Sequence, residues 1–144
     1  MTADPYNLRR FADLQDGKMA RVLAELRAGR KQTHWMWFVF PQLKGLGSSS
    51  MANEFGLASK AEAEAYLKHS VLGPRLVECT KLANRIEGST AEDIFDYPDY
   101  LKFRSCMTLF AEIAGEEGVF VEALVKYFEG RPDIRTLDLL YPAL

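Results

Sequence analysis

The amino-acid sequence predicts an all-α fold: one compact domain, residues 1–144, arranged as a bundle of about six to seven helices. Apolar residues recur at spacings of three and four along most of the chain, which is the period of an amphipathic helix. Glycines follow several of these segments, at positions where helices commonly stop. The valine- and isoleucine-rich alternation of a sheet is missing, and Trp35 to Phe40 is the one segment that is ambiguous between helix and strand.

The first half of the chain predicts two helices and a loop, separated by an aromatic block at residues 33–42, THWMWFVFPQ. A short helix opens at residues 5–7 and is broken by Gly17. A second helix covers about residues 18–28 and has Gly29 as its C-terminal stop. After the aromatic block, residues 44–57 read KGLGSSSMANEFGL, and their closely spaced glycines and serines predict an irregular loop.

The second half of the chain has the clearest helix signals. Ser59 with Glu62, and Thr90 with Asp93, both have the three-residue spacing of a capping box. The strongest helical pattern runs through residues 98–114, before a glycine. The predicted helical segments are 59–70, 72–87, 91–95, 98–114 and 119–128, with one further turn at 137–140.

Length and composition fit a folded protein with a single core. The 144 residues include 48% hydrophobic and 12% aromatic residues, which is enough apolar material for a core without disulfide bonds. The formal net charge is -2, so no overall basic field exists and we expect no nucleic-acid polymer as a partner. The N-terminus lacks the apolar core of a signal peptide, and no apolar run approaches the roughly 18 residues of a membrane span. We therefore expect a cytoplasmic protein without membrane contact.

Several kinds of chemistry lack their sequence signatures. Neither His34 nor His69 has a metal-ligand partner three or four residues away, so we expect no metal site. The chain has neither a P-loop nor a GxGxxG motif, and we expect no cofactor; GLGSSS resembles a phosphate-binding loop but follows no convincing strand. The two cysteines, Cys79 and Cys106, stand in apolar helical segments, where thiols are usually inert. Spacing alone leaves a Cys–His nucleophilic pair open.

The aromatic block THWMWFVFPQ supplies the first candidate site residues. Residues 35–40 are apolar on every side of a short helix, so most of them must be enclosed in the core. A tryptophan also has an indole N–H that needs a partner when buried, and a flat face that stacks on rings and cations. We therefore select Trp35, Trp37 and the nearby Gln42 as ligand-binding candidates. His34 is the catalytic candidate, because an imidazole can act as acid or base near neutral pH.

A second set of candidates lies in the helix predicted at residues 98–114. Lys102 and Ser105 are three residues apart, and Arg104 and Thr108 are four apart, so two adjacent helix faces each carry a cation and a hydroxyl. Such an arrangement suits a phosphate or carboxylate group. The alternative is that both cations form ordinary surface ion pairs.

Arg75 is a further ligand-binding candidate, near the start of the helix predicted at residues 72–87. A cation at a helix N-terminus opposes the helix dipole, so the position indicates a compensating partner. That partner is either a carboxylate of the protein or a bound anion.

Three blocks, AGRKQTHWMWFVFPQLKGLG, AYLKHSVLGPRL and KFRSCMTLF, resemble the signature blocks of a bacterial and fungal domain family of unknown function. Members of that family are sometimes labelled calpastatin, a label that does not fit, because a calpain inhibitor of that kind is a disordered polar chain. The resemblance extends from Arg10 to about Leu140 and implies a compact, mostly helical single domain. The family pattern favours serine at the position of Cys106, which argues against a cysteine mechanism. A remoter similarity to helical domains that act on ADP-ribose-type nucleotides assigns no catalytic residue.

The leading functional hypothesis is a site for a small anionic molecule of the nucleotide or ADP-ribose type. We predict that it forms where the segment from His34 to Gly47 meets the helix that carries Lys102, and that the protein binds or processes this molecule. An aromatic ring would stack on the ligand, and the cations would hold its phosphate or carboxylate. The sequence leaves open whether the protein is an enzyme.

The alternative is a non-catalytic module that binds a protein partner or forms a homo-oligomer. Its surface would be GLGSSSMANEF, with Met51 and Phe55 as apolar contacts. The two hypotheses differ in geometry. If His34, Gln42, Arg75 and Arg104 converge on one wet pocket, the ligand hypothesis gains, whereas scattered positions with Arg75 in an internal salt bridge favour the module or a purely structural role.

Overall fold

The computed structural model of the protein describes residues 3–115 and 117–142, and these residues form ten helices and no β-strand. The helices are α1 Arg9–Asp16, α2 Met19–Ala28, α3 Met36–Val39, α4 Ser50–Phe55, α5 Lys60–Lys68, α6 Leu72–Arg85, α7 Ala91–Phe95, α8 Asp99–Ile113, α9 Val119–Phe128 and α10 Ile134–Leu140. The predicted all-α class is confirmed. The predicted number of six to seven helices is wrong, because α3, α4 and α10 are separate helices of only four to seven residues. Helices this short repeat their apolar spacing too few times to be told from turns.

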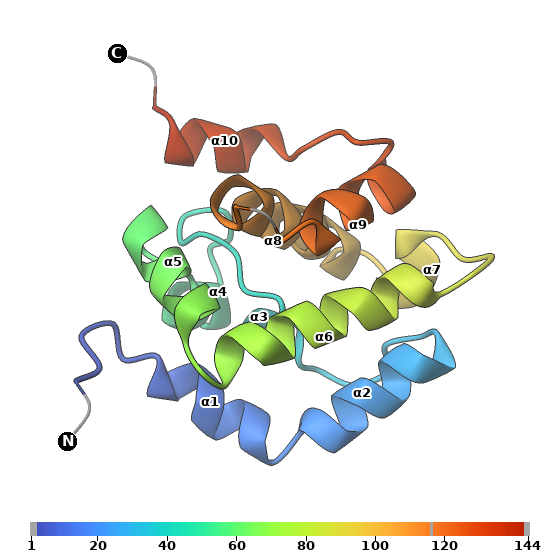
Figure 1. Ribbon diagram of the computed structural model, residues 1–144, viewed down its shortest axis with the longest axis horizontal. Coiled ribbons are helices and arrows are strands. Elements are labelled where there is room, and N and C mark those ends of the chain that lie inside the picture. Colours follow the sequence, from blue (N-terminus) through green and yellow to red (C-terminus); the bar gives the residue numbers. More distant parts are fainter. Residues whose placement is uncertain (1–2, 116, 143–144) are drawn as a thin grey trace.

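The helices pack around α6 and α8. Helix α6 crosses the molecule and contacts α2, α5 and α9, while α8 contacts α5, α7, α9 and α10. Figure 1 shows α1 and α2 on one side of α6 and the three helices α8, α9 and α10 on the other. Helix α3 lies inside this arrangement and contacts α1, α4, α6 and α8.

The aromatic block is the centre of the core, as its unbroken apolar run predicts. Trp35 is 1% exposed and Phe40 is fully buried. The ring of Phe40 meets Phe95 and Phe103 edge to face, with centroids 5.9 and 5.1 Å apart, and those two rings stack at 4.6 Å. Residues 35–40 therefore form the helix α3 and its flanks, not a strand.

The loop after the aromatic block is attached to the segment that follows α4. The Leu57 N–H donates to the Gln42 carbonyl at 2.9 Å, and the Lys44 N–H donates to the Leu57 carbonyl at 2.8 Å. A Cβ on Gly56 would lie 2.7 Å from the Cα of Lys44, so a side chain at residue 56 would push the two segments apart. These contacts fix the position of residues 42–44.

The two predicted capping boxes differ in outcome. At the start of α7, Thr90 and Asp93 form both reciprocal hydrogen bonds, so this box is confirmed. At the start of α5, the Ser59 hydroxyl accepts from the Glu62 N–H at 3.1 Å, which is one half of a box. The Glu62 carboxylate does not complete it, because it accepts from the Ala58 N–H and from Arg10.

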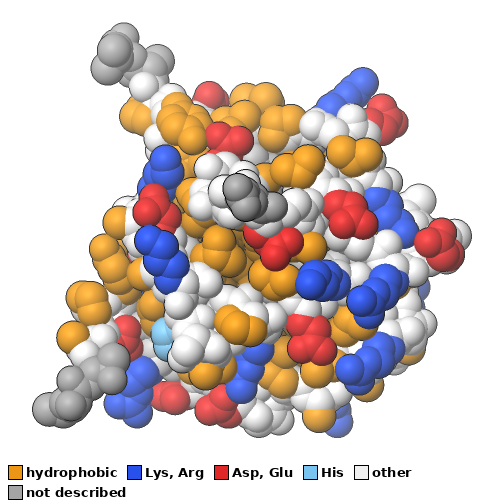
Figure 2. Space-filling model, in the orientation of Figure 1, with side chains coloured by type: hydrophobic (Ala, Val, Ile, Leu, Met, Phe, Trp, Pro, Cys, Tyr) orange, Lys and Arg blue, Asp and Glu red, His pale blue; other side chains and the backbone are white. Residues whose placement is uncertain are grey.

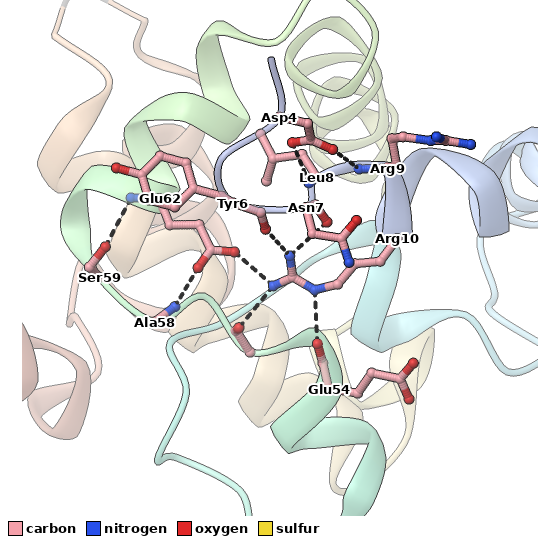
Figure 3. Close-up of polar contacts among 11 residues, drawn as sticks. Asp4, Tyr6, Asn7, Leu8, Arg9, Arg10, Glu54, Ala58, Ser59 and Glu62 are labelled. Atoms are coloured by element: carbon pink, nitrogen blue, oxygen red, sulfur yellow. Dashed lines mark hydrogen bonds and ion pairs between the residues drawn. The ribbon is translucent and has the colours of Figure 1, made fainter. Parts of the chain in front are cut away.

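Arg10 of α1 joins the N-terminal segment, the end of α4 and the helix α5 (Figure 3). Its guanidinium donates to the carbonyls of Tyr6 (2.6 Å), Asn7 (2.9 Å), Glu54 (2.9 Å) and Gly56 (3.2 Å) and to the carboxylate of Glu62 (2.7 Å). Every N–H of the side chain can be used in this arrangement. The side chains of Arg10 and Glu62 are only 16% and 5% exposed, so the ion pair is shielded from water.

The face of the molecule drawn in Figure 2 carries charged and apolar side chains side by side. Figure 2 shows basic, acidic and apolar side chains interspersed over this face, without a continuous basic surface on it. Across residues 3–115 and 117–142, no helix has the length and the hydropathy to cross a membrane.

Replacing Arg10 by methionine is expected to lower the free energy of unfolding by about 3 kcal/mol, because a buried carboxylate and several carbonyls lose their donor. The matched control is Arg9→Met on the same helix, where the side chain is 77% exposed. We expect that control to change the stability by less than about 0.5 kcal/mol. Urea denaturation measures both values, and equal stability of the two variants would contradict the role of Arg10.

Candidate functional site

The structure distributes the predicted site residues over several places. Gln42, Lys102 and Ser105 line one pocket, His34 and Trp35 line another, and Arg75 and Arg104 make contacts elsewhere. The single pocket that was expected to unite His34, Gln42, Arg75 and Arg104 is therefore not formed. The reason is local: His34 precedes the buried helix α3 and Gln42 follows it, so the two residues reach different pockets.

The pocket around Gln42, here termed the Gln42 pocket, has a volume of about 320 Å³. It forms where the loop after α3 meets the start of α8 and the start of α10. Its polar lining comes from Gln42, Lys102, Ser105, Asp133 and Arg135, and its apolar lining from Leu46, Pro98 and Leu101, with Gly47 between them. The second half of the segment 34–47 thus meets the helix that carries Lys102, whereas the first half, with His34, does not.

Lys102 contributes a positive charge that is only partly neutralised. Its ammonium lies 3.3 Å from Asp99 Oδ1, and the ammonium of the buried Lys31 lies 2.9 Å from Asp99 Oδ2. Two ammonium groups therefore share one carboxylate, which leaves one excess positive charge beside the Gln42 pocket. A partly buried excess charge favours an anion next to it.

Asp133 is fixed by its role as the N-cap of α10. Its Oδ2 accepts from the N–H of Thr136 at 3.0 Å and from the Thr136 hydroxyl, and it lies 3.2 Å from the Oγ of Ser105. Within the described parts of the chain, Oδ1 of Asp133 has no such partner and remains available. Arg135, in the first turn of α10, donates to the Leu46 carbonyl at 3.3 Å in an exposed hydrogen bond.

Gln42 and Trp37 differ in how they relate to the pocket. The side chain of Gln42 is half-buried and forms no hydrogen bond with residues 3–115 or 117–142, so its amide is free on the pocket wall. The ring of Trp37 lies beneath Lys102, whose ammonium is 5.5 Å from the ring centre. The Trp37 Nε1 is buried and has no hydrogen-bond partner among the described residues. Trp37 thus contacts Lys102 through the face of its ring and helps to hold the ammonium group in place.

The second pocket, here termed the His34 pocket, has a volume of about 360 Å³. It is lined by Gly17, Lys18, Arg21, Thr33, His34 and Trp35. The side chain of His34 is exposed to solvent there. Trp35, in contrast, is 1% exposed and its indole N–H donates to Glu25 at 2.9 Å, so its ring belongs to the core and only its edge forms the pocket wall.

Glu25 of α2 holds the loop that carries His34. Its carboxylate accepts from the N–H groups of Gln32 (2.6 Å) and Thr33 (3.1 Å), from the Thr33 hydroxyl (2.7 Å) and from the indole of Trp35. Burial raises the pKa of Glu25, but these hydrogen bonds outweigh burial and hold that pKa at about 2, below the ordinary 4.5. Glu25 therefore remains an anion, and its carboxylate accepts all four of these hydrogen bonds from the loop at residues 32–35.

Arg75 and Arg104 are engaged within the protein. The Arg75 guanidinium lies 2.9 Å from Asp16 Oδ1 and donates to the Gln15 side chain at 3.3 Å, so the carboxylate alternative applies. Arg104 donates to the carbonyl of Arg131 at 3.0 Å and stacks on a phenylalanine of α9. Both side chains thus have structural partners in place of the predicted ligand.

The remaining sequence candidates are buried. Burial raises the pKa of the Cys79 thiol to about 12, with a further increase from the charge of Glu78, and burial raises the pKa of Cys106 well above its ordinary value. Phe55 is 4% exposed, and Met51 is half-buried against the core, so neither forms an exposed anchor for a protein partner. No group of three or more His, Cys, Asp or Glu side chains in the described residues is placed to hold a metal ion.

A family model described as "Protein of unknown function (DUF1810)" matches residues 5–140. The chain belongs to the DUF1810 family. It is also similar to the crystal structure of the conserved hypothetical protein Rv1873 from Mycobacterium tuberculosis, with 52% sequence identity over 97% of this chain and 100% of that chain, and a TM-score of 0.95. A comparison with curated proteins found no match. The family and the fold are therefore established, and the resemblance of the three sequence blocks is confirmed.

Three residues of this DUF1810 chain were not predicted from its sequence as site residues. Asp133 and Arg135 lie in a segment that predicts only a single turn, and Glu25 lies in an ordinary helical pattern. The sequence Asp133-x-x-Thr136 does carry an N-cap signal, and reading it would have placed a carboxylate at the start of α10. Nothing in the local sequence indicates which loop Glu25 holds.

The stability of the protein should decline as the pH falls from about 5 towards 2, because the pKa of Glu25 is lower in the folded state than in the unfolded chain. The contribution of Glu25, about 1–2 kcal/mol after allowance for solvent, is complete above the unfolded pKa of 4.5 and disappears as the pH approaches 2. Glu25→Gln should be less stable by that amount at pH 7 and should decline less steeply in acid.

Urea denaturation at pH 7, 4 and 3 measures this pH dependence. Glu78→Gln, at an exposed position of α6, is the matched control. If Glu25→Gln and the wild-type protein lost stability in parallel between pH 7 and 3, the assigned role of Glu25 would be wrong.

Proposed function

We propose that the Gln42 pocket binds a small anionic molecule that also carries hydroxyl or amino groups, such as a mononucleotide or a sugar phosphate. The observation that supports this proposal is the meeting of unlike polar groups from three segments of the chain. Gln42 comes from the loop after α3, Lys102 and Ser105 from α8, and Asp133 and Arg135 from the start of α10.

Each polar group suits a different part of such a ligand. Lys102 and Arg135 are the cations that would hold a phosphate or carboxylate. The free Oδ1 of Asp133 would accept from a hydroxyl or amino group, and the amide of Gln42 can both donate and accept. Leu46 and Leu101 supply an apolar wall for the flat face of a ring.

The size of the pocket narrows the class of ligand. Pockets for small ligands have volumes of about 300–1,000 Å³. The Gln42 pocket, at about 320 Å³, is therefore suited to one nucleotide unit or one sugar phosphate rather than to a whole dinucleotide. His34 lies in the other pocket, so the proposal is one of binding and assigns no acid–base residue to this site.

The scattered positions of His34, Gln42 and Arg104 and the internal ion pair of Arg75 are the geometry expected for an interaction module or a purely structural role. The module on the GLGSSSMANEF surface nevertheless has weak support of its own. It relied on Met51 and Phe55 as apolar contacts, and Phe55 is a core residue whose ring packs against Phe11 and Phe38 at 5.7 and 6.1 Å. An interface needs exposed anchors, which these two side chains do not supply.

AMP or ribose 5-phosphate is expected to raise the melting temperature of the protein in a thermal-shift assay. A ligand at 100 times its dissociation constant adds about 2.7 kcal/mol, which corresponds to several degrees for a domain of this size. Adenosine, which lacks the phosphate, should give a smaller shift than AMP. Gln42→Met and Arg135→Gln should abolish the shift. The melting temperature of the free protein should change little, because neither side chain is part of the core and the one hydrogen bond of Arg135 is exposed and long.

Arg131→Gln is the matched control, since Arg131 lies four residues from Arg135 and its side chain is 76% exposed. This variant should respond to the ligand as the wild-type protein does. The proposal is wrong if neither AMP nor ribose 5-phosphate produces a shift, or if Arg131→Gln removes the shift as completely as Arg135→Gln.

A further inference from the structure

The His34 pocket differs from the Gln42 pocket in that no carboxylate lines it. Its lining includes the cations Lys18 and Arg21 and the imidazole of His34, and none of its lining side chains is a carboxylate. Lys18 and Arg21 stand three residues apart at the start of α2, where like charges repel each other. Neither cation forms an ion pair with any residue in the described parts of the chain, so their charges are compensated by solvent alone.

The acidic residues nearest to the pocket in the sequence are engaged elsewhere. Asp16, next to Gly17, pairs with Arg75 at 2.9 Å. Glu25 accepts hydrogen bonds from the N–H groups of the loop at residues 32–35. The fold therefore brings basic side chains from α2 and the imidazole of His34 together around a cavity. The carboxylates of Asp16 and Glu25 bind other groups of the protein.

A second hollow adjoins the His34 pocket along α2. It has a volume of about 390 Å³ and shares Arg21 and Thr33 with the pocket. Its other lining residues are Ala24, Glu25, Ala28 and Gln32. The one carboxylate among them, that of Glu25, already accepts four hydrogen bonds from the loop at residues 32–35. A ligand with an anionic end at Arg21 would thus have room for an uncharged polar part beside it.

We propose that the His34 pocket is a second ligand site, which takes the phosphate group of a phosphate monoester whose uncharged part lies along α2. Arg21 and Lys18 hold the phosphate, Arg21 through the paired N–H groups that match phosphate oxygens. His34 donates a further hydrogen bond from the opposite wall. Glu25 is a positioning residue, because it fixes the loop that presents His34. This site is separate from the Gln42 pocket and does not depend on the ligand proposed there.

The histidine resonances of the protein give a direct test, because the chain has only two histidines. In a proton NMR titration, glycerol 3-phosphate should change the chemical shifts of the imidazole protons of His34, which lines the pocket. His69 serves as an internal reference, since its Nδ1 accepts from the N–H groups of Val71 and Leu72 at the start of α6. Arg21→Gln should weaken the binding at least tenfold.

Two further variants make the test specific. Arg27→Gln removes an exposed cation from the last turn of α2, outside both hollows, and should leave the affinity unchanged. Gly17→Leu should block the pocket without disturbing the fold, because a Cβ on Gly17 would meet no atom within 4 Å and the backbone φ of -87° suits any residue. Its melting temperature should equal that of the wild-type protein while the shift of His34 disappears.

The proposal is overturned if glycerol 3-phosphate leaves the His34 signals unchanged, or if Arg21→Gln and Arg27→Gln weaken the binding equally. Inorganic phosphate that binds as tightly as glycerol 3-phosphate would overturn the role given to the second hollow. Gln42→Met should retain the response of His34, and this result separates a failure of this site from a failure of the Gln42 pocket.

Discussion

The guanidinium of Arg10 is the contact on which the geometry of the Gln42 pocket depends. It holds the carbonyls of Glu54 and Gly56 and so determines where the chain runs after α4. The next residue, Leu57, exchanges backbone hydrogen bonds with Gln42 and Lys44. The loop that forms one wall of the pocket is therefore placed by an arginine that does not itself line the pocket. Because the buried Glu62 carboxylate needs the same guanidinium, folding of the N-terminal half and formation of the pocket are coupled.

Asp99 couples the core to the charge of the same pocket. It binds the ammonium groups of Lys31 and Lys102, and each of these lies over a tryptophan of the aromatic block, at 5.3 Å from Trp35 and 5.5 Å from Trp37. Neither tryptophan lines the Gln42 pocket, so there the tryptophans act through the lysines. One carboxylate between two cations leaves a net positive charge, which gives an electrostatic reason for an anionic ligand that does not depend on pocket shape.

Local sequence signals predict what is local in this structure. Helix α9 has the predicted bounds Val119–Phe128, because its apolar spacing is regular and Gly130 follows it. Helix α3 was ambiguous, because six apolar residues in a row have no period. For the site, Lys102 and Ser105 could be predicted as a pair since helix geometry relates them. The partners of Arg75 and Arg104 could not, because Asp16 and the Arg131 carbonyl are 59 and 27 residues away in the chain.

The separation of His34 from Gln42 limits what chemistry the protein can perform at one place. The two residues flank a helix that the core encloses, and they line different pockets. A reaction that needs the imidazole as acid or base and the Gln42 pocket for binding would require both groups at one ligand, because proton transfer needs hydrogen-bond distance. This arrangement is the reason why the function proposed for the Gln42 pocket is binding without catalysis by His34. Any acid–base role of His34 belongs to the ligand of its own pocket, where Lys18 and Arg21 are the neighbouring charges.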